Sequence, residues 1–249
     1  MSRPQEIRLS RYLADCGIWS RRKCENLITS GRITVDGCKI TDLSLKVAGS
    51  SSVKLDGKPV NPQTKIVLAV NKPPGYISTA SDEFGRKTVM DLVKNVEGRL
   101  YPAGRLDRDS SGLIILTNDG ELVYNITHPK FMIPKTYELL IRGTMSKKDL
   151  ARLKNGITID NKKLMPNKIS IIKNTRSHEL LRIQIHEGRK RILRRVFAFL
   201  DYEVLDLKRV KIGGLGLENL KEGHYRILKK EDIEKLLIPV QNVTRYKLS

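Results

Sequence analysis

Residues 104–120 read Gly-Arg-Leu-Asp-Arg-Asp-Ser-Ser-Gly-Leu-Ile-Ile-Leu-Thr-Asn-Asp-Gly and join a charged loop to a continuous apolar run. The run 113–117 is bounded by turn residues, which predicts a buried strand. Two acids and two bases alternate in the loop that leads into it. From composition alone this loop suits a salt-bridged turn, because aspartate favours turns. A carboxylate held there beside two arginines would also stay ionised, which suits a nucleophile or a general base.

The segments around this stretch predict an α+β fold. Strands are expected at 66–70, 135–143, 168–173, 180–185, 203–212 and 224–228, and helices at 88–93, 121–126, 189–200 and 230–237. Strands outnumber helices and do not alternate strictly with them. The pattern therefore favours a mixed, mostly antiparallel sheet flanked by helices over a doubly wound one. Residues 213–216 are rich in glycine but open no helix, and we interpret them as a turn.

The first 60 residues predict a separate small unit of two short helices and a small sheet. Ser10 and Ser20 are expected to cap the two helices, which Gly17 and the pair Ser30-Gly31 end. Two Asp-Gly pairs, at 36–37 and 56–57, lie between β-forming residues and predict hairpins. Residues 61–64 read as a linker. We therefore expect a small N-terminal domain with its linker over 1–62 and a larger domain over 63–249.

Composition excludes several classes of protein. No stretch approaches 18 apolar residues, so no membrane span is expected, and the N-terminus has no apolar segment of a secretory signal. The three cysteines and four histidines lack the spacing of a usual zinc site, so no metal site is expected. An odd number of cysteines without a Cys-x-x-Cys pair indicates reduced thiols in a cytoplasmic protein.

The net charge points to a polyanionic partner. Lys and Arg number 47 against 27 Asp and Glu, which gives +20. Aromatic residues make up only 5% of the chain, so phosphate contacts rather than base stacking should supply most of the affinity. Arg21, Arg22 and Lys23 occupy the first turn of the expected second helix. Cations disfavour a helix N-terminus unless phosphate binds there, although an ordinary solvated face is the alternative.

Two sets of motifs carry a resemblance to known families. The segments Ser20-Arg21-Arg22-Lys23 and Val35-Asp36-Gly37 resemble motifs of the S-four RNA-binding domain, and the similarity covers about residues 7–66. It implies that the domain over 1–62 binds structured RNA and that the domain over 63–249 holds any catalytic site. Residues 104–120 resemble the signature of a family of ribosomal RNA pseudouridine synthases. In this family the A type modifies RNA of the small ribosomal subunit, and the B, E and F types modify RNA of the large subunit. Three further segments support this second resemblance: Asn71–Gly75, the Lys-x-Tyr at 135–137, and the basic run 187–195.

The resemblance implies roles for particular residues. Asp107 matches the catalytic aspartate, and Arg105 matches the arginine that enters the RNA stack as the target uridine flips out. Tyr137 matches the tyrosine that packs on the target base, and Arg194 matches the basic residue that pairs with the aspartate. The expected RNA-binding cations are Arg21, Arg22, Lys23, Arg32, Arg189, Arg191 and Arg195. Ile192 departs from the family's usual glutamine, which removes an expected hydrogen bond, and no cofactor is implied.

The resulting hypothesis is a monomeric ribosomal RNA pseudouridine synthase. The residues at 110–112 and 117–120 favour the B type of large-subunit enzyme, and hence a target in 23S RNA. A target in 16S RNA is the alternative. Asp107 can attack the anomeric carbon or assist formation of a glycal, and the sequence does not choose between them. A non-catalytic rRNA-binding assembly factor would not need Asp107, Tyr137 and Arg194 together. A nuclease would need metal carboxylates or histidine pairs that are missing.

Overall fold

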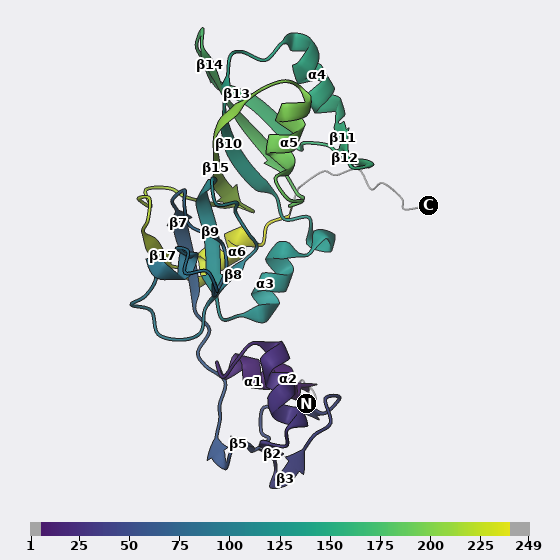
Figure 1. Ribbon diagram of the computed structural model, residues 1–249, viewed down its shortest axis with the longest axis vertical. Coiled ribbons are helices and arrows are strands. Elements are labelled where there is room, and N and C mark those ends of the chain that lie inside the picture. The colour runs from purple at the N-terminus through teal and green to yellow at the C-terminus, as the bar shows by residue number, and fades with distance from the viewer. Residues whose placement is uncertain (1–5, 240–249) are drawn as a thin grey trace. The chain divides into compact units, whose positions relative to one another are not determined.

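The computed structural model describes residues 6–239 (Figure 1). The chain forms two units, and each is described by itself. The first comprises the chain up to Ile66 with Glu97–Arg99 and Asn118–Gly120, and the second comprises the remainder. No helix among residues 6–239 has the length and apolar character that crossing a membrane requires.

The first unit packs two helices against a small sheet, as the sequence predicts. The helices are α1 (Leu9–Asp15) and α2 (Arg21–Thr29). The four-stranded sheet has the order β3-β2-β5-β6, with β2 at Ile33–Val35, β3 at Cys38–Ile40, β5 at Val53–Leu55 and β6 at Lys58–Pro59. A separate pair joins β1 (Ile7–Arg8) to β4 (Lys46–Val47). Leu9, Leu13, Cys24, Ile28 and Ile33 are fully buried between these elements, which gives the unit its own core.

Local signals set most boundaries of this unit. The Ser20 side chain caps α2 by accepting a hydrogen bond from the Lys23 amide, and Asp36 and Gly37 both have positive φ in the β2–β3 hairpin. The expected Ser10 cap is wrong. Strand β1 pairs through Arg8, which becomes the N-cap, so α1 begins at Leu9 and Ser10 lies inside the helix. Its buried hydroxyl instead accepts a hydrogen bond from Arg21 at 3.4 Å.

The second unit is built on a nine-stranded sheet whose main order is β13-β14-β10-β15-β9-β7-β17. β8 pairs with β9, and β16 pairs with β15. The strand bounds are β7 Val67–Lys72, β8 Tyr101–Ala103, β9 Ser111–Thr117, β10 Lys135–Arg142, β13 Lys168–Asn174, β14 His178–Ile185, β15 Val204–Ile212, β16 Leu215–Gly216 and β17 Tyr225–Ile227. The strands pair antiparallel except β9 and β15, which pair parallel. The expectation of a mixed, mostly antiparallel sheet is confirmed.

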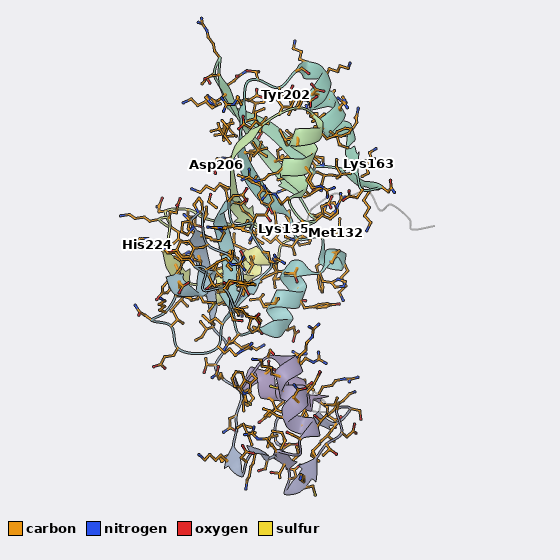
Figure 2. All side chains as sticks on the ribbon, in the orientation of Figure 1. Met132, Lys135, Lys163, Tyr202, Asp206 and His224 are labelled. Carbon is orange, nitrogen blue, oxygen red and sulfur yellow. The ribbon has the colours of Figure 1, made fainter. Side chains whose placement is uncertain are left out.

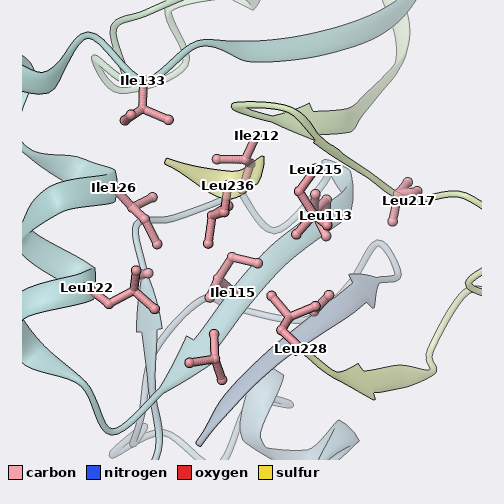
Figure 3. Close-up of a cluster of buried hydrophobic side chains, with 13 residues drawn as sticks. Leu113, Ile115, Leu122, Ile126, Ile133, Ile212, Leu215, Leu217, Leu228 and Leu236 are labelled. Carbon is pink, nitrogen blue, oxygen red and sulfur yellow. The ribbon is translucent and has the colours of Figure 1, made fainter. Parts of the chain in front are cut away.

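Helices complete the second unit. They are α3 (Gly120–Thr127), α4 (Lys147–Asn155), α5 (Ile192–Phe199) and α6 (Lys230–Leu236), with single 3-10 turns at Val89–Leu92 and Pro129–Phe131. Figure 3 shows how α3 and α6 bring Leu122, Ile126 and Leu236 onto the β9 residues Leu113 and Ile115. This apolar cluster secures the strand that follows the charged loop.

Some elements differ from the sequence prediction. Helix α4 and the hairpin of β11 (Ile157–Ile159) and β12 (Lys162–Leu164) were not expected. The basic helix expected from 189 begins at Ile192, because Arg191 takes a left-handed conformation with φ 51° and caps it. Of the turn expected at 213–216, only Gly213, with φ 56°, and Gly214 form the turn between β15 and β16, because Leu215 and Gly216 pair with β15 as β16.

The parallel joint between β9 and β15 depends on Gly112. Only two registered pairs form it, Lys208 with Ser111 and Arg209 with Gly112. Gly112 has φ +105°, and a Cβ added there would overlap the backbone of Arg209. Glycine is therefore required both by the backbone conformation and by the close approach of the two strands.

Replacing Gly112 with alanine is expected to lower the free energy of unfolding by about 2–4 kcal/mol, because it combines a disfavoured φ with overlap against backbone. Urea titration followed by circular dichroism measures the change. Gly188→Ala is the matched control, since a Cβ at Gly188 meets nothing within 4 Å and should change stability by less than about 0.5 kcal/mol. Equal losses in the two variants would contradict the steric argument.

Candidate active site

A cleft of about 940 Å³ opens in the second unit. It lies between the loop that precedes β9, the start of β10, the ends of β14 and β15, and the segment that leads into α5. Of the predicted site residues, Arg105, Asp107, Tyr137, Arg189 and Arg191 line it. Met132, Lys135 and Lys163, labelled in Figure 2, also belong to its lining. The structure thus brings together residues from separate sequence motifs.

Asp107 is held on a loop that is fixed through its backbone. The Ser78 hydroxyl lies 2.8 Å from the Leu106 carbonyl and 3.0 Å from the Leu106 amide. The Gly75 amide donates to the Arg108 carbonyl at 2.7 Å. The Asp107 side chain is half-buried, and its carboxylate makes no hydrogen bond or ion pair within residues 6–239. A carboxylate on a fixed backbone with its oxygens free is available to a ligand in the cleft.

Lys72, at the end of β7, supports the same loop through main-chain carbonyls. It is fully buried, and its ammonium donates to the carbonyls of Pro73 and Tyr76 at 2.9 Å and reaches that of Arg108 at 3.5 Å. Burial lowers the pKa of Lys72 to about 8, against the opposing effect of the Asp109 and Asp107 charges. Lys72 lies within the motif at 71–75, but the sequence alone assigned it no role.

Tyr137 supplies an apolar wall to the cleft. It lies in β10, only 9% exposed, opposite Ile183 of β14 and Arg209 of β15. The neighbouring lining residues Leu207 and Leu193 are also buried. A flat aromatic side chain in this setting can hold a planar base.

Arg194 does not contact the aspartate expected from the resemblance. Its Nε lies 3.3 Å from the Asp109 carboxylate, and its guanidinium also donates to the carbonyls of Val204 and Asp109. Those two carbonyls direct the side chain towards Asp109 rather than Asp107. Arg191 adds two hydrogen bonds to Asp109 at 2.9 and 3.0 Å. These bonds, together with the Arg194 charge, lower the pKa of Asp109.

Positive charge dominates the cleft. Its lining contains eight cationic side chains (Arg105, Lys135, Lys162, Lys163, Arg189, Lys190, Arg191 and Arg209) and two acidic ones (Asp107 and Glu187). Burial, and secondarily the charge of Arg209, lowers the pKa of Lys135 to about 8. The excess of cations attracts a polyanion.

Two of the predicted RNA-binding arginines, Arg189 and Arg195, contact the β11–β12 hairpin. Arg189 pairs with Glu187 and donates to the carbonyls of Ile159 and Lys162, which anchors the β11–β12 hairpin beside the cleft. Arg195 pairs with Asp160 of the same hairpin. These arginines therefore shape one side of the cleft.

The predicted cations of the first unit gather on and near α2. Arg21, Arg22 and Lys23 form its exposed first turn, and the Lys23 ammonium lies 4.8 Å from the ring of Trp19. Arg32 pairs with Asp56 across the small sheet. The helix N-terminus and its three cations form a positive surface of this unit. Among residues 6–239, no group of three or more His, Cys, Asp or Glu side chains is arranged to hold a metal ion.

Lys135 and Arg209 are lining residues that sequence reasoning missed as functional candidates. Lys135 belongs to the Lys-x-Tyr motif, which was a usable signal. Arg209 lies in a strand pattern with no loop or glycine to distinguish it, and only the fold brings it to the cleft.

Comparison with known proteins assigns both parts of the chain. Residues 66–199 match the RNA pseudouridylate synthase family, and residues 7–53 match the S4 domain. The chain is 39% identical over 231 residues to the ribosomal large subunit pseudouridine synthase B of Bacillus subtilis, which covers 92% of this chain and 95% of that protein. It is also 39% identical to an uncharacterized RNA pseudouridine synthase of Aquifex aeolicus, with 93% and 94% covered. A crystal structure of a pseudouridylate synthase superimposes with TM-score 0.66 at 27% identity, covering 92% of this chain and 99% of that one.

The Lys135 ammonium is expected to titrate near pH 8, so the cleft loses this charge as the pH rises through that value. An unfolded lysine stays protonated to about pH 10.4. Between these values the unfolded state binds more protons, so the contribution of Lys135 to stability rises with pH.

Carbon-13 NMR of ε-labelled lysine measures the midpoint, and the Lys135→Arg variant assigns the signal. The signal of Lys72, also near 8, should remain. A Lys135 midpoint above about 10 would contradict its burial.

Proposed function

The chain belongs to the RNA pseudouridylate synthase family, and we propose that it isomerises a specific uridine of ribosomal RNA to pseudouridine, with Asp107 as the reacting carboxylate. One observation carries the role of Asp107. Its carboxylate has no partner within the described residues and lines an electropositive cleft, on a loop that is fixed by backbone contacts.

The reaction breaks the bond between N1 of uracil and the anomeric carbon, rotates the base and joins C5 to the same carbon. The proton on C5 is then lost and N1 takes up a proton, so the product is an isomer. The Asp107 carboxylate can attack the anomeric carbon directly or assist a glycal intermediate. Both routes require the carboxylate to lie close to the ribose, and its place in the lining of the cleft allows this.

The other residues of the cleft suit the physical demands of this reaction. The base must leave its stack, at a cost of about a few kcal/mol, and the exposed guanidinium of Arg105 can fill the gap. Tyr137 offers the detached base an apolar surface on which to turn. Arg191 and Arg194 are held by Asp109 next to the loop, so their role is to shape the site and to meet phosphate rather than to pair with Asp107.

The similarity to the Bacillus large-subunit enzyme favours a target in 23S RNA. We propose a cytoplasmic, monomeric enzyme whose N-terminal S4 domain docks on structured rRNA. Mapping the uridine that loses its modification in a deletion strain tests the target directly, and a lost site in 16S RNA would favour the alternative.

Asp107→Asn should abolish pseudouridine formation, by at least about 1,000-fold, because the amide is neither nucleophile nor base. Carbodiimide labelling with primer extension measures the product. Stability should change by less than about 1 kcal/mol, since the carboxylate has no protein partner within the described residues. Asp206→Asn is the control, an exposed acid of β15 outside the lining of the cleft, and we expect it to retain the activity. An undiminished product in Asp107→Asn would overturn the assignment.

Replacing Arg21, Arg22 and Lys23 together with glutamine should weaken RNA binding and leave the rate at saturating RNA unchanged. For each phosphate that the variant no longer neutralises, the slope of log Kd against log salt should fall by about 0.7–0.9. Filter binding between about 50 and 200 mM salt measures this slope. Lys54→Gln with Lys58→Gln removes charge from the sheet of the same unit as a control. Equal effects of the two replacements would show that α2 is not a specific docking surface.

A further inference from the structure

Arg209, on β15, is a deeply buried cation without an acidic partner. Its side chain is 4% exposed, and within residues 6–239 it forms no ion pair with a carboxylate. Buried arginines are normally paired, because an unpaired charge is costly to remove from water. Its location beside the Asp107 loop gives it a different set of partners.

The guanidinium bridges the two ends of that loop. Its Nε donates to the Leu113 carbonyl at 2.7 Å, and Nη1 donates to the Arg105 carbonyl at 3.4 Å. Arg105 lies shortly before Asp107 in the chain, and Leu113 lies in β9 just after the loop. The main chain of Arg209 also pairs with Gly112. One residue therefore contacts the chain on both sides of Asp107.

The third nitrogen of the guanidinium has no partner. Nη2 is buried and makes no hydrogen bond to the described protein, while Arg209 contributes to the lining of the cleft. A buried charged donor left unpaired costs free energy, and such groups concentrate where a ligand completes the bonding. Lys135 lies close enough for the Arg209 charge to affect it. Arg209 thus belongs to the floor of the substrate site.

We propose that Arg209 is a positioning residue for Asp107: it fixes both ends of the catalytic loop through the Arg105 and Leu113 carbonyls and so sets the position of the carboxylate. The inference rests on the proposed function, because it assumes that Asp107 reacts. A displacement of about 1 Å in a reacting group can slow a reaction about 100-fold. Loss of Arg209 should therefore reduce the chemical step more than RNA binding.

The experiment measures the single-turnover rate at saturating RNA and the Kd for RNA in three variants. Arg209→Ala should slow the rate at least about 100-fold, and Arg209→Lys, which keeps the charge but lacks the planar guanidinium that spans the Arg105 and Leu113 carbonyls, about 10-fold. Both should leave Kd within about threefold. Lys211→Met, which removes an exposed cation of the same strand, should leave the rate unchanged. Added methylguanidinium should raise the single-turnover rate of Arg209→Ala at least about tenfold, because it can occupy the space that the side chain leaves.

Three outcomes would overturn the proposal. Unchanged saturating rates in the Arg209 variants would mean that the bridge does not position Asp107. A higher Kd for RNA with an unchanged rate at saturating RNA would mean that Arg209 binds RNA rather than positions Asp107. Methylguanidinium that raises the melting temperature of Arg209→Ala without raising its rate would indicate a purely structural role. If Arg209→Ala does not fold, Arg209→Lys decides alone. Failure of the wild-type chain to form pseudouridine refutes the proposed function instead, so the two failures are distinguishable.

Discussion

The close approach of Gly112 to the main chain of Arg209 is the contact on which the second unit depends. It is the parallel joint through which β9, in one half of the sheet, meets β15, in the other. This joint links the two halves of the sheet, and it brings the loop before β9 beside the start of β10 and the entry to α5. The cleft exists because those segments meet there.

Side-chain donors hold the loop that carries Asp107 by reaching its main-chain carbonyls. The Asp107 carboxylate takes part in no salt bridge within the described residues. Lys72 reaches Arg108, and Arg209 reaches Arg105 and Leu113. Asp109 instead takes up the neighbouring arginines, Arg191 and Arg194. This division leaves one acid of the loop neutralised by its surroundings and the other open to a ligand, although the two lie close together in the chain.

The sequence predicted much of this arrangement, for identifiable physical reasons. The β9 strand and the Ser20 cap follow from local periodicity and hydrogen bonding, and both are present. The Ser10 cap failed because strand pairing of Arg8 overrode a local preference, and Arg191 delayed α5 through a left-handed backbone. Asp107 and Tyr137 could be picked out from their motifs. The partner of Arg194 and the position of Arg209 could not, because both depend on long-range pairing that a periodic pattern does not encode.

The β9–β15 joint also bears on how the protein matures. Arg209 and Leu113 lie 96 positions apart, whereas pairs such as β10 with β14 and β13 with β14 are closer in the chain. Contacts between distant residues close large loops and form slowly. Local hairpins can therefore be complete in a chain whose cleft does not yet exist. Activity would appear only in molecules in which β9 has paired with β15. A measurement of activity therefore detects complete folding, whereas a measurement of secondary structure also counts molecules that lack the cleft.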